Sequence, residues 1–228
     1  MGLLSGFRDG SVSSKVVFRA PKEYFLEGCA ITKSDRLVVL TWRNGKILEF
    51  SLPDFRLIRQ LPFPHEGWGL TYDGDRNELI ATDGSAKLLF IDTSSLQTTR
   101  TCNVRLSHDG ITHISVRYMN ELEYMNGLVF ANIYIPASAK VSTNFIVGIN
   151  PVSCDVEQII PFELNAGTRG NREHVMNGIA KWNNSTNQFL VTGKNWNKMF
   201  LVEMTPEQNA TTSKHNITEY LAQNLFFR

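Results

Sequence analysis

A carboxylate, a carboxamide, an amine and three aromatic rings stand at matching places in a repeated pattern of this chain. Each copy of the pattern has a short polar or Gly-containing motif, an apolar strand, a turn and a second strand, and spans 12 to 17 positions. Carboxylates transfer protons, and amide and ammonium groups stabilise developing negative charge, so this set could do acid–base chemistry if the fold brought it together. The residues concerned are Glu27, Trp42, Trp68, Asn120, Tyr134 and Lys194.

The repeat itself indicates the fold class. Its four copies begin at Glu27, Gly67, Asn120 and Asn177. A period of about 40 to 60 residues with several strands in each unit is typical of β-propellers, which set their blades around a central channel. Equivalent positions of successive blades converge on one mouth of that channel. We therefore expect an all-β propeller whose mouth collects the six residues.

The chain has the pattern of one domain, residues 1–228, with four whole units and one partial unit. Residues 1–24 supply only the outer strands of a first blade, and residues 205–228 form a C-terminal tail with a short helix at 219–224. A hairpin turn is expected at Asn44-Gly45, and the polar, Gly-rich stretch 165–174 is expected to be a loop at the rim of the site. β-Branched and apolar runs predict strands at 16–18, 36–42, 46–50, 55–61, 78–82, 87–92, 98–104, 127–135, 144–149, 188–192 and 199–204.

Composition argues against several function classes. The chain has 228 residues, of which 42% are hydrophobic and 20% charged, as in ordinary globular domains. Its net charge of +1 gives no reason to expect a nucleic acid or an anionic membrane as partner. No apolar run approaches the roughly 20 residues of a membrane span, and the N-terminus is too polar for a signal peptide. The compartment stays undetermined, and a truncated N-terminus would allow a secretory location.

The chain has three cysteines, Cys29, Cys102 and Cys154. They are far apart and odd in number, so their spacing matches neither a disulfide framework nor a CxxC zinc pattern. We expect them to be small buried hydrophobic residues.

Eight short motifs resemble, in their order, those of plant- and bacterial-type glutaminyl cyclases, also called glutamine cyclotransferases. The resemblance covers roughly residues 10–204, and it depends on the order of the motifs because each alone is weak. The family fold is a five-bladed β-propeller, so the resemblance implies five blades, the first of them incomplete here. The motifs are Glu27-Gly28, Leu40-Thr41-Trp42, Glu66-Gly67-Trp68-Gly69-Leu70-Thr71, Asp83-Gly84-Ser85, Asn120-Glu121-Leu122-Glu123, Ala131-Asn132-Ile133-Tyr134, Asn177-Gly178-Ile179-Ala180 and Val191-Thr192-Gly193-Lys194-Asn195-Trp196.

The resemblance implies that the chain converts the N-terminal glutamine of a peptide or protein to pyroglutamate and releases ammonia, without a metal. The α-amine attacks the side-chain amide carbon and passes through a tetrahedral oxyanion. The family motif Phe-x-Glu-Gly assigns the proton shuttle to Glu27. Lys194 and Asn120 match the family's Lys and Asn, and as donors near the oxyanion each would contribute roughly 2 to 4 kcal/mol. The alternatives are a solvated lysine and an asparagine that bonds to the backbone.

Aromatic residues complete the implied site. Trp42 and Trp68 match pocket tryptophans of the family, whose faces would enclose the glutamine methylenes and exclude water. Phe25 is a weaker candidate of the same kind. Tyr134 stands where the family usually carries Trp, and it adds a hydroxyl to an aromatic face. The family's first strand, Phe-Thr-Gln-Gly-Leu, has no counterpart here, although its Phe and Gln line the family site.

Other residues and chemistries have less support. Asp83 and Asn177 occupy equivalent places in their units, and we assign them to turn and strand-end hydrogen bonds. The five histidines lack the spacing of metal ligands, and neither a Gly-x-Ser-x-Gly elbow nor a P-loop is present. We expect no cofactor and leave open a structural cation in the channel.

The expected partners are peptides or proteins with N-terminal glutamine, bound by a monomer. Two alternatives come from other function classes. One is a catalytically impaired propeller whose mouth binds peptides as a scaffold. The other is a metal-dependent propeller hydrolase such as a lactonase.

Overall fold

The computed structural model describes residues 2–5, 13–107, 112–134, 144–162, 175–182 and 187–203. The expected loop 165–174, the tail 205–228 and its helix 219–224 lie outside these residues. The described secondary structure consists of strands. None of it is a helix that is long and apolar enough to cross a membrane.

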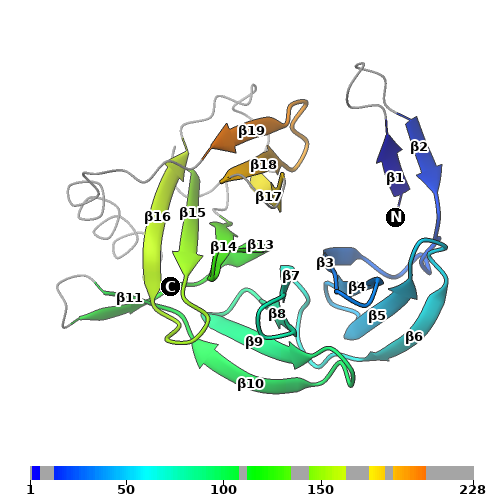
Figure 1. Ribbon diagram of the computed structural model, residues 1–228, viewed down its shortest axis with the longest axis horizontal. Helices are drawn as coiled ribbons and strands as arrows, with labels where there is room; N and C mark the ends of the chain where they lie inside the picture. The colour runs from blue at the N-terminus through cyan, green and yellow to red at the C-terminus, as the bar shows by residue number, and fades with distance from the viewer. Residues whose placement is uncertain are drawn as a thin grey trace.

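Four antiparallel sheets stand around a common centre as the blades of a propeller (Figure 1). Within each blade the chain moves from the innermost strand outward, and each strand pairs with the next. Blade I contains β3 (Leu26–Ile31), β4 (Arg36–Thr41), β5 (Lys46–Ser51) and β6 (Leu57–Pro62). Blade II contains β7 (Leu70–Asp73), β8 (Glu78–Ala81), β9 (Lys87–Asp92) and β10 (Thr98–Asn103).

The other two blades follow the same plan. Blade III contains β13 (Met119–Met125), β14 (Leu128–Ile133), β15 (Asn144–Ile149) and β16 (Val156–Phe162). Blade IV has three described strands, β17 (Met176–Lys181), β18 (Gln188–Gly193) and β19 (Phe200–Glu203). The innermost strands β3, β7, β13 and β17 contact one another in this order around the centre.

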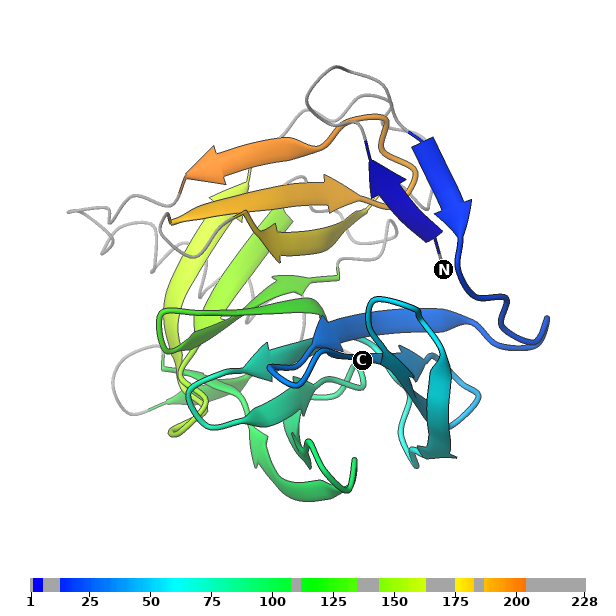
Figure 2. The ribbon, with the colours of Figure 1, turned by 45° about the vertical axis from the view of Figure 1, so that its right-hand side comes forward.

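Two small hairpins complete the described part. One joins β11 (Arg105–Ser107) to β12 (His113–Ser115), between blades II and III. The other joins β1 (Gly2–Ser5) to β2 (Ser13–Val16), beside the gap between blades IV and I (Figure 2). The expectation of five blades is therefore corrected to four for the described residues. The N-terminal segment forms two paired strands with no inner strands beside them, so it makes no full blade.

Apolar side chains on both faces of the middle strands explain the packing of the blades. In β4, Val38 and Leu40 pack with Leu89 and Ile91 of blade II, while Leu37 and Val39 face the opposite way, toward the chain around Tyr24. Similar cores join blade II to blade III and blade III to blade IV. Burial of each large apolar side chain contributes about 1.5 to 3 kcal/mol. Because the cores lie between blades, they hold the inner strands in place around the channel.

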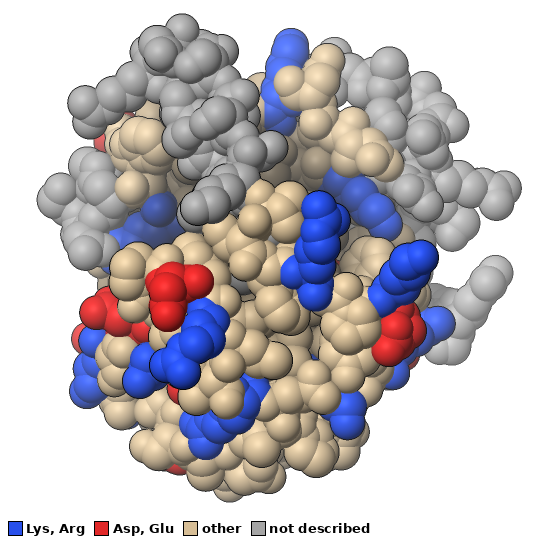
Figure 3. Space-filling view, turned by 90° about the vertical axis from the view of Figure 1, so that its right-hand side faces the viewer, with Lys and Arg blue, Asp and Glu red and all other residues tan. Residues whose placement is uncertain are grey.

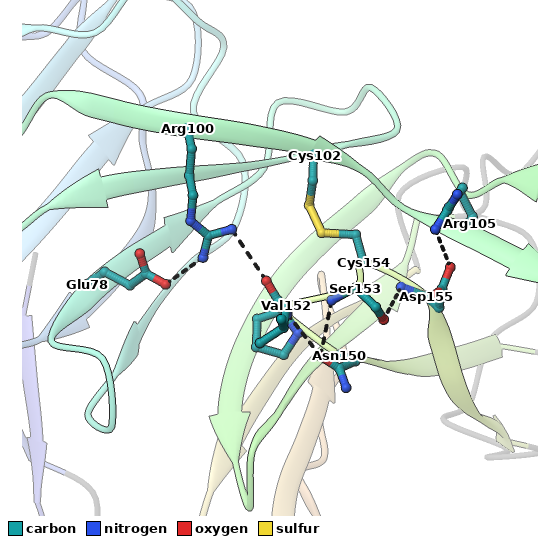
Figure 4. Close-up of a disulfide and its surroundings, with 10 residues drawn as sticks. Glu78, Arg100, Cys102, Arg105, Asn150, Val152, Ser153, Cys154 and Asp155 are labelled. Carbon is teal, nitrogen blue, oxygen red and sulfur yellow. Dashed lines mark hydrogen bonds and ion pairs between the residues drawn. A yellow bond between two sulfur atoms is a disulfide. The ribbon is translucent and has the colours of Figure 1, made fainter.

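A disulfide joins Cys102 in β10 to Cys154, which precedes β16 (Figure 4). The expectation of unpaired cysteines was wrong for these two, which are bonded. The expectation of burial is confirmed for Cys154 and wrong for Cys29, which is exposed. Sequence spacing did not reveal the pair because its members lie 52 positions apart on different blades. Beside the disulfide, Nη2 of Arg105 lies 3.0 Å from Oδ1 of Asp155, so the outer seam between blades II and III is joined at several points.

The side of the molecule that carries β1 and β2 displays Lys and Arg side chains with a few acidic ones among them (Figure 3). The basic side chains are spaced over this face and do not merge into one patch.

Candidate functional site

A β-bulge recurs at the same point of three inner strands. In blade I, Leu26 pairs with Thr41 and Cys29 pairs with Val39. Two residues of β3, 27 and 28, therefore lie opposite one residue of β4. In blades III and IV the same irregularity falls between Met119 and Leu122, and between Met176 and Ile179. A bulge re-aims side chains and is often found next to active sites. The first bulged residues of the three blades are Glu27, Asn120 and Asn177.

The second strands end in equivalent positions as well. In each blade, one residue of the second strand pairs with the residue just before the bulge, and the next residue along the chain is a candidate site residue. These candidates are Trp42, Tyr134 and Lys194. Their backbone N–H groups make the same kind of hydrogen bond, to the carbonyl oxygens of Phe25, Tyr118 and Val175 at 2.8 to 2.9 Å. The repeat therefore sets an indole, a phenol and an amine at matching places around one mouth of the channel.

Close approach of the inner strands brings these positions together. The N–H of Gly28 donates to the carbonyl oxygen of Trp68 at 2.8 Å, which joins blade I to blade II directly beside Glu27. A Cβ on Gly69 would collide with the carbonyl oxygen of Asn120, so only glycine permits this contact between blades II and III. Glu27 in β3 and Asn120 in β13 thus lie on inner strands of one ring, on either side of Trp68, which lies just before β7.

The carboxyl of Glu27 is electrostatically coupled to Lys194 across the mouth. Burial raises the pKa of Glu27 above its usual range, and the charge of Lys194 lowers it by a smaller amount. The Lys194 side chain itself is exposed. A half-buried carboxyl with a raised pKa is a stronger base when ionised, and a nearby cation keeps part of it ionised.

Two further carboxyls extend the acidic cluster down the channel. Burial, and then the charges of Glu27 and Glu123, raise the pKa of Glu121 to about 8. Burial also raises the pKa of Glu123 to about 7, against the opposing hydrogen bond and charge of Lys181. The raised pKa values favour the protonated forms of Glu121 and Glu123 near neutral pH, so these carboxyls can act as a proton reservoir next to Glu27. The motif Asn120-Glu121-Leu122-Glu123 contained these residues, but their chemistry depends on burial that the sequence does not show.

Asn120 is buried, with 8% of its surface exposed, and its Oδ1 has no hydrogen-bond partner among the described residues. Its backbone oxygen accepts a hydrogen bond from Oγ1 of Thr82 at 3.3 Å, which fixes the main chain. A buried carbonyl without a partner costs roughly 1 to 3 kcal/mol. The carbonyl of this side chain therefore makes no bond to the backbone within the described residues, and it is available to a ligand.

Glu66 fixes both predicted pocket tryptophans, and the sequence reasoning did not include it in the site. Its Oε2 accepts hydrogen bonds from Nε1 of Trp42 and of Trp68, each at 3.1 Å. Its Oε1 lies 3.1 Å from Nε of Arg43, whose guanidinium stacks 4.0 Å above the Trp42 ring. The hydrogen bond from Trp68, followed by Arg43, holds the pKa of Glu66 below its usual range.

Aromatic contacts extend the pocket from Trp68. The ring centroids of Trp68 and Tyr134 lie 6.2 Å apart with the rings nearly perpendicular, and those of Trp68 and Tyr118 lie 6.5 Å apart. Phe25 contacts Trp42 edge-on at 5.8 Å and is half exposed. Tyr118 is a second residue that sequence reasoning missed. The signal was available, because Glu66 and Tyr118 take the same place in their repeats as Phe25.

Of the residues assigned to structure, Asp83 behaves as expected, because its Oδ1 accepts a hydrogen bond from the N–H of Ser85 at 3.0 Å. Asn177 does not, because its Oδ1 is buried and lacks a partner among the described residues. No cluster of three or more His, Cys, Asp or Glu side chains suited to a metal ion occurs in the described ranges.

A cavity of about 1060 Å³ opens at the opposite ends of the inner strands. Cys29, Thr32, Tyr72, Glu123 and Lys181 are among its lining residues. The lining excludes the predicted site residues, which lie toward the other mouth.

Fold and site together define a β-propeller with a carboxyl, a lysine and a group of aromatic side chains at one mouth of its channel. The glutamine cyclotransferase family model matches residues 6–204. The chain belongs to this family.

Two relatives agree with this membership. The glutaminyl-peptide cyclotransferase of Arabidopsis thaliana is 29% identical over 206 residues, which are 86% of this chain and 58% of the relative. This chain therefore matches only part of that relative's length. The crystal structure of Myxococcus xanthus glutaminyl cyclase superposes with a TM-score of 0.67 at 27% identity, covering 86% of this chain and 78% of that one.

Proposed function

We propose that this chain is a glutaminyl-peptide cyclotransferase, which converts the N-terminal glutamine of peptides or proteins to pyroglutamate and releases ammonia. Its family membership and the names of both relatives support this activity. In this proposal β1 and β2 belong to a fifth blade, the enzyme acts as a monomer, and the reaction needs no metal or cofactor.

The reaction moves one proton while one bond forms and one breaks. The neutral α-amine attacks the side-chain amide carbon, and a new C–N bond closes the five-membered ring. Glu27 takes the proton that the attacking nitrogen loses and delivers it to the amide nitrogen. The old C–N bond then breaks and ammonia leaves. The raised pKa of Glu27 supports this role, because raising the pKa of a carboxyl makes its ionised form a better proton acceptor.

Lys194 and Asn120 are proposed to stabilise the tetrahedral oxyanion. The ammonium of Lys194 and the Nδ2 of Asn120 are donors, and preorganised donors of this kind are worth about 2 to 4 kcal/mol each. The free Oδ1 of Asn120 can accept an N–H of the α-amine at the same time. A buried, fixed amide suits this use because it needs little reorganisation when charge develops.

The aromatic side chains are proposed to fold the glutamine side chain back on its own amine. Trp42, Trp68 and Tyr134 would enclose its methylenes, and Phe25 would cover the outer edge. The two hydrogen bonds to Glu66 hold the indoles in fixed orientations. A preorganised pocket favours the cyclising rotamer, which lowers the entropic part of the barrier.

Membership of the glutamine cyclotransferase family is the single observation that carries the proposal. The effect of the Lys194 charge on the pKa of Glu27 supports the roles given to these two residues. The test measures ammonia release from a Gln-initiated dipeptide, with and without chelator, for the wild type and Glu27→Gln. We expect release that survives chelator and falls at least ~100-fold in Glu27→Gln with binding nearly intact. Wild-type rates in that variant would remove Glu27 from the mechanism.

Two outcomes would favour the alternatives. Ammonia release that chelator abolishes would support a metal-dependent enzyme. Binding of the peptide without turnover would support a scaffold, which the unaccompanied β1–β2 hairpin favours.

A further inference from the structure

Two unpartnered carbonyl oxygens belong to the first bulged residues of blades III and IV. In the described part of the chain, three buried side-chain atoms have no hydrogen-bond partner: Oδ1 of Asn120, Asn177 and Asp155. Of these, Oδ1 of Asp155 lies 3.0 Å from Nη2 of Arg105 in an ion pair. The oxygens of Asn120 and Asn177 remain. Native structures seldom leave such groups unpaired, so each needs an explanation, such as a ligand.

Asn177 takes the place in blade IV that Asn120 takes in blade III. Each follows a buried methionine and opens the bulge of its inner strand, so the repeat sets both residues at the same place in their blades. The backbone just before Asn177 is held by other groups. Nδ2 of Asn132 donates to the carbonyl oxygen of Met176 at 2.8 Å, and the N–H of Lys194 donates to that of Val175 at 2.8 Å. The Asn177 side chain is therefore placed without using its own carbonyl.

The neighbourhood of Asn177 suggests which substrate group it meets. Lys194 directly follows Gly193, which pairs with Met176 next to Asn177, so a cationic donor and a carbonyl acceptor belong to the same end of the β17–β18 pair in blade IV. A carboxamide presents the complementary pair, an oxygen that accepts and an NH₂ group that donates. A carboxylate presents acceptors only, and it would set oxygen against oxygen at Asn177.

We propose that Asn177 binds substrate, with its Oδ1 accepting an N–H of the glutamine carboxamide while Lys194 faces the carboxamide oxygen. Asn177 thereby selects glutamine over glutamate at the N-terminus of the peptide. The departing nitrogen keeps its N–H groups as it becomes ammonia, so the contact lasts through the reaction. An amide carbonyl takes up no proton, so Asn177 leaves the proton transfer to Glu27. This inference rests on the proposed function.

The test compares two peptides and two substitutions in a Glu27→Gln background, which prevents cyclisation during the measurement. Calorimetry measures binding of Gln-Ala-amide and Glu-Ala-amide to the parent and to the added Asn177→Leu variant. Leucine has nearly the same size as asparagine but no acceptor. We expect Gln-Ala-amide to bind about 10- to 100-fold more weakly, and Glu-Ala-amide to bind no more weakly than before. Asn103→Leu, the same change at an exposed position of β10, should alter neither affinity.

A second variant separates recognition from folding. Asn177→Asp keeps an acceptor oxygen, so it should bind Gln-Ala-amide more tightly than Asn177→Leu does, and it should reject Glu-Ala-amide more strongly than the parent. Equal weakening of both peptides in both variants, or unchanged affinity for Gln-Ala-amide in Asn177→Leu, would overturn the role of Asn177. A wild-type chain that neither binds Gln-Ala-amide nor releases ammonia from it would instead overturn the proposed function, and this inference with it.

Discussion

Trp42 and Trp68 come from different blades, and their indole nitrogens donate to the same oxygen, Oε2 of Glu66, at 3.1 Å each. One carboxylate thus sets the orientation of two aromatic faces. Arg43 holds the other carboxylate oxygen and stacks on Trp42, so the arrangement is fixed from both sides. The shape of the pocket therefore depends on a charged residue that need not touch the substrate.

Glu66→Gln should loosen both indoles, because the glutamine amide has only one oxygen to accept from the two donors and Arg43. We expect kcat/KM to fall by up to about 10-fold, since hydrogen bonds to charged groups are worth more than neutral ones but partial exposure weakens them. The near-ultraviolet circular dichroism of the tryptophans should weaken in parallel. Glu23→Gln, an exposed control, should change neither property. An unchanged tryptophan signal would show that Glu66 does not orient the rings.

Lys194→Met should move the acidic limb of the pH–rate profile to higher pH. The Lys194 charge lowers the pKa of Glu27, so its removal lets Glu27 keep its proton to a higher pH. Activity that needs ionised Glu27 is then lost over a pH interval in which the wild type still works. The measurement is kcat/KM for a Gln-initiated dipeptide across the pH range, with Lys198→Met as an exposed control. If kcat/KM falls in Lys194→Met but the acidic limb of the profile keeps its pH, Lys194 does not alter the pKa of Glu27 and acts only as a hydrogen-bond donor.

How far the sequence could predict the site is clear from particular residues. Glu27, Trp42, Trp68 and Tyr134 could be placed at one mouth because the strand–turn–strand repeat is local and its hydrophobic pattern is strong. The strands 36–42, 46–50, 87–92 and 144–149 were predicted within one residue of their observed bounds for the same reason.

The sequence could not show features that depend on contacts between blades. The Cys102–Cys154 bond joins β10 of blade II to the segment before β16 of blade III, and no local pattern in the sequence reports that contact. Glu121 looked like an ordinary strand carboxylate, and only burial beside Glu27 gives it a raised pKa. The four whole units of the repeat were predicted, whereas the fifth blade that the resemblance implies is represented among the described residues by the β1–β2 pair.

The disulfide should stabilise the seam between blades II and III. Its loop spans 52 residues, so the chain-entropy model gives about 4 kcal/mol as an upper figure. Cys102→Ser/Cys154→Ser should therefore lose about 2 to 4 kcal/mol, which lowers the Tm by about 5 to 15 °C. Reduction of the wild type should give the same shift in thermal unfolding. Cys29→Ser, a change at an exposed free thiol, should leave the Tm in place. Equal Tm values for oxidised and reduced protein would contradict this prediction.

The pH dependence of stability should report the buried proton of Glu121. The folded protein keeps this proton up to about pH 8, whereas a carboxyl with the ordinary pKa of 4.5 releases it in the unfolded chain. The folded state therefore binds more protons than the unfolded state between these values, so the free energy of unfolding falls as pH rises from about 4.5 to about 8.

Glu121→Gln removes this titration, and its stability should fall less over the same window because glutamine stays neutral in both states. Glu123, whose pKa is raised to about 7, should still make the free energy of unfolding of Glu121→Gln fall with pH, but by less. The double variant Glu121→Gln/Glu123→Gln should show a smaller pH dependence still. Urea unfolding at several pH values measures the slope, and Glu203→Gln on the exposed part of β19 is the matched control. If the wild type and Glu121→Gln lose stability in parallel from pH 5 to pH 8, the Glu121 carboxyl is ionised in the folded protein and cannot serve as the proton reservoir beside Glu27.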